Sequence, residues 1–171
     1  MPPHRALDLN GVTESAGSAG KSIEYGAGSR GAVRSSRFQA APLRLLSGEV
    51  TVEGNTFITA DPVYTTPPLV PRLVTNTFAA ADTSTIHIVT TPGQEVGVLD
   101  QDVVWKPMGT ATRYRLDDDV NVVAGKRLEI GPDVELYTGN RPNNDDDFDL
   151  QGNGTVLMTG AGDQLHQQPP A

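Results

Sequence analysis

The chain has 171 residues, with 21 acidic and 13 basic side chains, which gives a net charge of −8 at pH 7. It has no cysteine, which excludes disulfides and thiolate metal sites, and its acidic balance argues against unspecific binding to nucleic acid. Only 37% of its residues are hydrophobic and 5% are aromatic, whereas 18 glycines and 13 prolines favour a turn-rich β protein over a helical bundle.

Neither a membrane span nor a secretory signal is expected. No segment approaches the roughly 20 apolar residues that a helix needs to cross a bilayer. The N-terminal stretch MPPHRALDLNGVTESAGSAG has no apolar core of the kind that a signal peptide requires.

Residues 1–43 lack sustained periodicity and are rich in glycine, alanine and serine, as in ESAGSAGKS and YGAGSRGAVRSS. This composition is typical of a flexible segment. Residues 1–45 carry +3 and the remainder carries −11. We therefore predict a flexible basic arm over 1–43. The sequence GAGSRG in this segment matches a dinucleotide-binding pattern. That pattern requires a helix directly after the glycines, and AVRSSRFQAAP has a poor helix-forming sequence, so the match predicts no cofactor site.

Residues 44–104 show β patterning. EVTVEGNTFI alternates on both sides of a Glu-Gly-Asn turn signal and predicts a hairpin. The proline-rich PVYTTPPLVPRLV favours an extended edge or a linker over a central strand. STIHIVTT and EVGVLDQDVVW are further candidate strands. We predict a small antiparallel β unit here.

Residues 105–166 contain strands that are too short for an ordinary hairpin. The apolar pairs Val120/Val122 and Leu128/Ile130 recur 28 positions later as Phe148/Leu150 and Val156/Met158, whereas the next pair, Val134/Leu136, does not recur cleanly. A repeat of this length is typical of a solenoid, in which each strand pairs with its equivalent in the next coil. The sequence favours β-helix-like coils over 105–166 and a tail over 167–171, and ordinary antiparallel sheet remains the alternative.

The stretch WKPMGTATRYRLDDDVNVVAGKRLEIGPDVEL resembles the entry into right-handed parallel β-helix domains of secreted or surface bacterial proteins. The resemblance rests on a Trp, then a Tyr, then a phrase of alternating valines with Gly, Leu, Ile and Pro, here Trp105, Tyr114, Val120, Val122, Gly125, Leu128, Ile130, Pro132 and Val134. Gly131 and Asp133 depart from the usual phrase. The resemblance implies an all-β fold and an extracellular or cell-surface location, and it leaves the activity open.

Two groups of residues are candidates for ligand binding. The acidic run NNDDDFD offers closely spaced oxygen ligands, so Asp145, Asp146 and Asp147 form a candidate calcium site, although the run has neither the EF-hand spacing nor the glycine-rich nonapeptide of calcium-binding rolls. Trp105 and Tyr114 could stack on a sugar, and the alternative is that they cap an open end of the coils.

No catalytic residues and no other cofactor are predicted. The carboxylates that face outward in the predicted register could serve a glycosidase, but two coils offer little cleft. They are Asp117, Asp119, Glu129 and Glu135.

The sequence favours a non-enzymatic structural or interaction module of a bacterial surface or secreted protein, involved in adhesion or glycan contact. One alternative is a fragment of a carbohydrate-active β-helix enzyme, a polysaccharide lyase or a glycoside hydrolase. Another is a virion structural component. The expected partners are a polysaccharide, or another protein or further coils at the C-terminal end. Neither nucleic acid nor membrane is expected as a partner.

Overall fold

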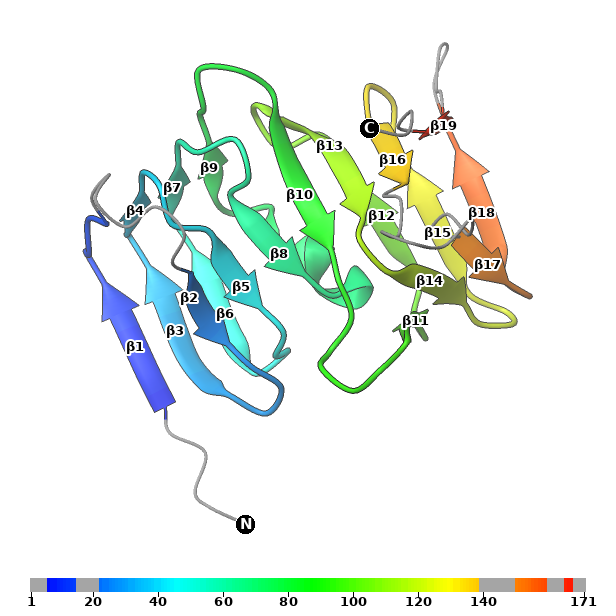
Figure 1. Ribbon diagram of the computed structural model, residues 1–171, viewed down its shortest axis with the longest axis horizontal. Coiled ribbons are helices and arrows are strands. Elements are labelled where there is room, and N and C mark those ends of the chain that lie inside the picture. The colour runs from blue at the N-terminus through cyan, green and yellow to red at the C-terminus, as the bar shows by residue number, and fades with distance from the viewer. Residues whose placement is uncertain (1–5, 15–21, 139–149, 160–164, 168–171) are drawn as a thin grey trace, which may run out of the picture.

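A computed structural model describes residues 6–14, 22–138, 150–159 and 165–167. The chain is all-β, and its strands wind into a parallel solenoid in which each coil lies beside the previous one (Figure 1). Every pairing between its labelled strands is parallel. Among the residues described, no helix is long and apolar enough to span a membrane.

The solenoid has three faces, and only one of them is continuous. The long sheet holds seven strands in chain order: β2 (Ile23–Tyr25), β5 (Leu43–Leu45), β8 (Val63–Thr65), β10 (Ser84–Ile88), β13 (Ala111–Leu116), β16 (Glu135–Thr138) and β19 (Leu165–Gln167). The first face consists of two separate sheets, one of β1 (Ala6–Asn10), β3 (Arg30–Arg34) and β6 (Val50–Glu53), the other of β11 (Val96–Leu99), β14 (Asp119–Val122) and β17 (Leu150–Gly152). The second face is divided likewise, into β4 (Arg37–Phe38), β7 (Thr56–Phe57) and β9 (Thr77–Phe78), and β12 (Val103–Trp105), β15 (Arg127–Ile130) and β18 (Thr155–Met158).

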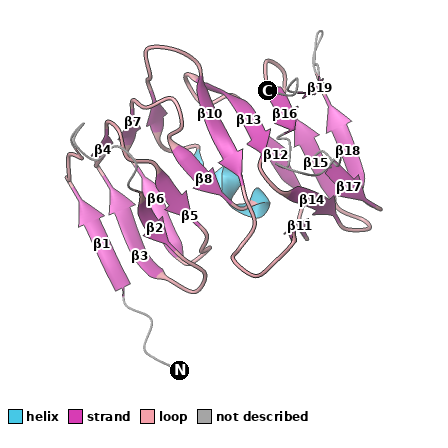
Figure 2. Ribbon diagram, in the orientation of Figure 1, coloured by secondary structure: helices cyan, strands magenta, loops and turns pink. Residues whose placement is uncertain are grey.

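A 3₁₀ helix, η2 (Pro67–Leu73), causes the break in the first face (Figure 2). It occupies the place between β6 and β11 and contacts both. The prolines of η2 cannot donate to a β ladder, which excludes a strand at this place. The prediction of an edge or a linker is wrong for the start of the proline-rich segment, because Val63–Thr65 form β8, a central strand that pairs with β5 on one side and β10 on the other. Its buried residues, among them Leu69 and Leu73, still contribute to the core. We call the coils through β9 the N-terminal stack and the coils from β11 onward the C-terminal stack, and β10 lies between them in the long sheet.

The core is built from columns of inward side chains. In the N-terminal stack, Phe38, Phe57 and Phe78 stack with ring centroids 4.6 and 5.1 Å apart. Nearby, the buried Asn55 accepts a hydrogen bond from the Ser36 backbone N–H and donates to the Asn76 side chain. Columns of this kind satisfy buried polar groups and fill the interior without a second layer of structure.

The predicted inward positions of the C-terminal stack are confirmed, since Val120, Val122, Leu128, Ile130, Val134 and Leu136 are all buried. The 28-residue repeat is confirmed for Leu128 and Ile130, which pair with Val156 and Met158. It is wrong for Val120, which pairs with Leu150, 30 positions on. The coil therefore contains two extra residues between β14 and β17.

Two predictions about the first part of the chain are wrong. The described residues of the predicted flexible arm, 1–43, already form β1 to β5 and pair in parallel with later coils. Residues 44–104 are coils of the same solenoid and not an antiparallel unit, because β6 and β7 pair with earlier strands rather than with each other. The turn-rich composition of both segments reflects the tight corners between strands. The strands between these corners are so short that they show little hydrophobic periodicity.

Candidate functional site

The outer face of the long sheet carries one row of polar and aromatic side chains in register. The row runs through Glu24, Arg44, Tyr64, His87, Arg115 and Tyr137, one residue from each of six neighbouring strands. The residues on both sides of Arg44 and Tyr64 in their strands are buried in the core. Because side chains alternate across a strand, the row is directed away from the core. We call this set the outer row.

His87 lies in the middle of the outer row between two carboxylates. Its Nδ1 is 2.6 Å from Asp117 Oδ2, and its Nε2 is 2.9 Å from Asp61 Oδ1. The Tyr64 ring stacks on the imidazole with a centroid distance of 4.2 Å and an interplanar angle of 18°. As a result, the His87 side chain is only 8% exposed, although it lies on the outer face.

The pKa of His87 is raised above its ordinary value of 6.5. Burial by itself lowers it, but the hydrogen bonds from Asp117 and Asp61, together with their negative charges, outweigh this effect. Both ring nitrogens face carboxylates, so the geometry is that of an imidazolium that donates twice. An imidazole held in this way has no free nitrogen with which to act as a general base on a substrate.

The other charges near the outer row are also paired. Arg113 donates to Glu135 at 2.7 Å, and the Tyr137 hydroxyl donates to the same Glu135 oxygen at 2.7 Å. Arg115 Nε lies 2.8 Å from Asp117 Oδ1. Asp117 and Glu135 are thus each engaged by an arginine, and Glu135 also accepts from Tyr137.

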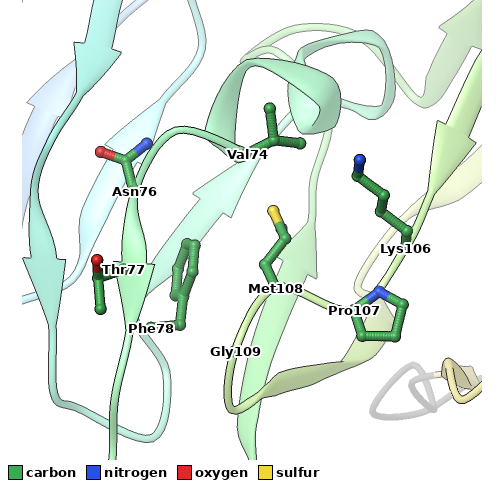
Figure 3. Close-up of a pocket in the computed structure, with 8 residues that line it drawn as sticks. All are labelled: Val74, Asn76, Thr77, Phe78, Lys106, Pro107, Met108 and Gly109. Atoms are coloured by element: carbon green, nitrogen blue, oxygen red, sulfur yellow. The ribbon is translucent and has the colours of Figure 1, made fainter.

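Among the residues described, a hollow of about 430 Å³ lies beside β9, where the second face is broken (Figure 3). Phe78, Met108 and Lys106 are among the residues that line it (Figure 3). The Asn76 amide nitrogen already donates to the Val52 and Leu73 carbonyls. The hollow therefore has a mixed polar and apolar lining with one cation, Lys106, and its Asn76 amide nitrogen is already engaged.

The prediction that Trp105 and Tyr114 bind a ligand is wrong, because both side chains lie inside the C-terminal stack. Trp105 and Tyr114 are both fully buried and stack on each other with a centroid distance of 5.4 Å. The Tyr114 hydroxyl donates to the Lys106 carbonyl at 2.7 Å. The two rings fill the interior of the C-terminal stack, and neither can reach a sugar or cap an open end.

The candidate calcium ligands Asp145, Asp146 and Asp147 lie outside the described residues, and that prediction stays untested. In the run of three aspartates at 117–119, Asp117 is hydrogen-bonded to His87, and Asp118 accepts hydrogen bonds from the backbone and side chain of Thr90. Within the described ranges, no group of three potential metal ligands lies close enough to hold an ion. GAGSRG turns from the end of β2 directly into the start of β3 without a helix, so its geometry is that of a corner.

Sequence reasoning missed the cluster around His87. The alternation in STIHIVTT already places His87 and Thr85 on the same face, opposite to Ile86 and Ile88. What the sequence does not supply is the parallel register that brings Asp61 and Asp117 to the two ring nitrogens across 26 and 30 positions of chain.

No protein-family model matches this sequence, and no curated protein or solved structure is significantly similar to it. The fold is therefore established here by the strand pairing alone.

Proposed function

We propose that this protein is a non-enzymatic interaction module, a rigid solenoid that contacts an extended glycan along the outer face of its long sheet. The observation that carries the proposal is the outer row. Neighbouring strands are about 4.8 Å apart, so six positions in register extend over roughly 24 Å. A straight row of this length suits a polymer that makes many weak contacts better than a compact small molecule.

The chemistry of the outer row suits sugars. Hydroxyl groups both donate and accept hydrogen bonds, and the row presents guanidinium donors beside carboxylate acceptors. Half-buried tyrosines add apolar surface with a polar tip. Arg44 lies over the Tyr64 ring at 6.0 Å, and Arg113 lies over the Tyr137 ring at 5.6 Å, so the arginines and tyrosines hold one another in place.

The state of the ionisable groups supports binding rather than turnover. His87 has both nitrogens engaged, and Glu135 is bound by Arg113 and Tyr137. The row thus lacks a free base next to a free acid, which glycoside cleavage requires.

The proposal includes a place at a bacterial cell surface or in a secreted protein, because the phrase from Trp105 to Val134 resembles proteins found there. It also includes a partner, either another protein or further coils, beside β18. Val156 and Leu157 on this strand are 42% and 39% exposed, and apolar side chains in that position are stabilised when another coil or protein covers them.

Binding of the protein to a panel of immobilised neutral and acidic polysaccharides tests the proposal. We expect at least one polysaccharide to retain the wild-type protein, and Arg44→Ala with Tyr137→Ala to weaken retention about tenfold or more. The matched control is Arg127→Ala, which removes a half-exposed arginine from β15 on another face.

Two results would contradict the proposal. If the control and the outer-row variant lost binding equally, the long sheet would not be the contact surface. If soluble sugars or unsaturated products accumulated during incubation, the protein would be an enzyme, and the carbohydrate-active alternative would replace the scaffold.

A further inference from the structure

The two stacks are joined chiefly through the long sheet. The first face is interrupted by η2, and on the second face β9 and β12 belong to different sheets. At the break in the second face, a backbone hydrogen bond still joins the two sides, because the Thr110 N–H donates to the Phe78 carbonyl at 3.1 Å. The pairing of β8, β10 and β13 therefore carries most of the main-chain connection between the stacks.

The cluster around His87 spans these three strands. Asp61 comes two residues before β8, His87 belongs to β10, and Asp117 directly follows β13. The two hydrogen bonds of one imidazolium thus tie the last coil of the N-terminal stack to the first coil of the C-terminal stack.

Loss of the imidazolium proton would break one of these two links. A neutral imidazole has one N–H donor and one lone pair. Whichever nitrogen loses the proton then presents its lone pair to a carboxylate at hydrogen-bonding distance, which is repulsive, and the ring is too buried for water to take over freely.

We propose that His87 is a pH-sensitive fastener that holds the two stacks together when it is protonated and loosens their junction when it is neutral. Charged and titratable groups face it from the strands on both sides. On the β8 side they are Asp61 and Tyr64, with Arg44 of β5 beyond the Tyr64 ring. On the β13 side they are Asp117 and Arg115, and Arg115 is paired to Asp117. Arg113, opposite Thr85, is engaged by Glu135.

The direction of the pH effect follows from the raised pKa of His87. A histidine with a raised pKa in the folded state contributes stability that is complete below about 6.5, its ordinary unfolded value. This contribution is lost as the pH rises through the folded-state pKa. Each unit between the two pKa values corresponds to a tenfold change in the folding equilibrium.

The first measurement is the titration of the His87 ring by NMR in the full chain. We expect two protonated ring nitrogens at about pH 6 and a midpoint above 6.5. Asp61→Asn removes one partner at an exposed position and should lower the midpoint without unfolding the protein, because the Asp61 side chain is 56% exposed. A wild-type midpoint at or below 6.5, or one unchanged by Asp61→Asn, would overturn the proposal.

The second measurement is amide hydrogen exchange at about pH 6 and about pH 9, corrected for intrinsic chemical rates. We expect β8, β10 and β13 to lose about tenfold protection in the wild type at high pH, while β3 and β6 change less. His87→Gln, which keeps one donor but does not titrate, should show no difference between the two pH values. Equal loss of protection in His87→Gln, or uniform loss across all strands, would assign the effect to other groups and overturn the proposal.

Discussion

The repeat is shorter in most of the N-terminal stack than in the C-terminal stack, although β1 pairs with β3 at a step of 24 residues. Gly31 pairs with Val50 and Arg37 with Thr56, each 19 positions on, and Leu43 pairs with Val63, 20 positions on. In the C-terminal stack the equivalent steps range from 22, between Arg113 and Glu135, to 30, between Val120 and Leu150. The extra residues form loops that leave the coil, while the strands keep their pairing.

The interiors of the two stacks differ as well. Like side chains stack on like in the N-terminal stack, with three phenylalanines in one column and Asn55 bound to Asn76 in another. The C-terminal stack has aliphatic columns and one large pair, Trp105 on Tyr114. Solenoid coils thus tolerate different packing so long as the inward positions stay in register. Substitutions in the two stacks test how far the stability of each stack depends on these columns.

The largest effect is expected from Trp105→Ala in the C-terminal stack. Trp105 is fully buried, and truncating a buried aromatic to alanine costs about 3–5 kcal/mol. Urea unfolding measures the loss, and hydrogen exchange locates it. Phe57→Ala, in the middle of the phenylalanine column, is the matched variant of the N-terminal stack. If both variants unfolded the whole chain in one transition, the two stacks would be a single cooperative unit.

A smaller effect is expected from Asn55→Ala, which tests the polar column. Asn55 is completely buried and its amide nitrogen also donates to the Val33 carbonyl at 2.8 Å. Removing the side chain leaves buried backbone groups without partners, at a cost of about 2–3 kcal/mol. Asn121→Ala, on the outer side of β14, is the control and should cost well under about 1 kcal/mol. Equal losses, measured by thermal unfolding, would show that the column adds nothing specific.

Gly31→Ala tests how closely the first two coils approach. Gly31 has a φ of +131°, and an added Cβ would lie 2.1 Å from the Leu7 carbonyl oxygen. We expect a loss of about 2 kcal/mol and faster exchange in β1. Gly125→Ala is matched, since Gly125 also has a positive φ but no atom within 4 Å of the added Cβ. It should cost about 1 kcal/mol from backbone strain alone, so a similar loss in both variants would contradict the close contact.

The smallest effects are expected from the exposed ion pairs, one in each stack. Arg34→Gln removes the partner of Glu53, and Arg113→Gln removes the partner of Glu135, where all four side chains are between 41% and 50% exposed. Pairs exposed to this degree contribute about 0–1 kcal/mol, and salt screens them. A larger loss for Arg113→Gln in chemical unfolding would mean that its contact with Tyr137 stabilises the outer row.

Part of the fold and little of the site could be predicted from the sequence. The alternation around Leu128 and Ile130 was sufficient to predict inward positions and a solenoid repeat, because a coil buries only its inward side chains. Residues 44–104 were misread because VTVEGNTF has the pattern of a hairpin, and a corner between two faces uses the same turn residues. Trp105 and Tyr114 were misjudged because size and polarity do not tell which side of a strand faces the core.

The sequence by itself determined the strand periodicity, the tight corners, the exclusion of a strand by the prolines of η2 and the absence of cysteine chemistry. These depend on residues within a few positions of one another. The tertiary structure decided the parallel pairing, the continuity of the long sheet and the partners of His87. Each of these requires residues 19 or more positions apart to meet, as Gly31 meets Val50 and Asp61 meets His87. The number of residues in each coil sets which distant residues pair, and the local sequence pattern does not encode that number.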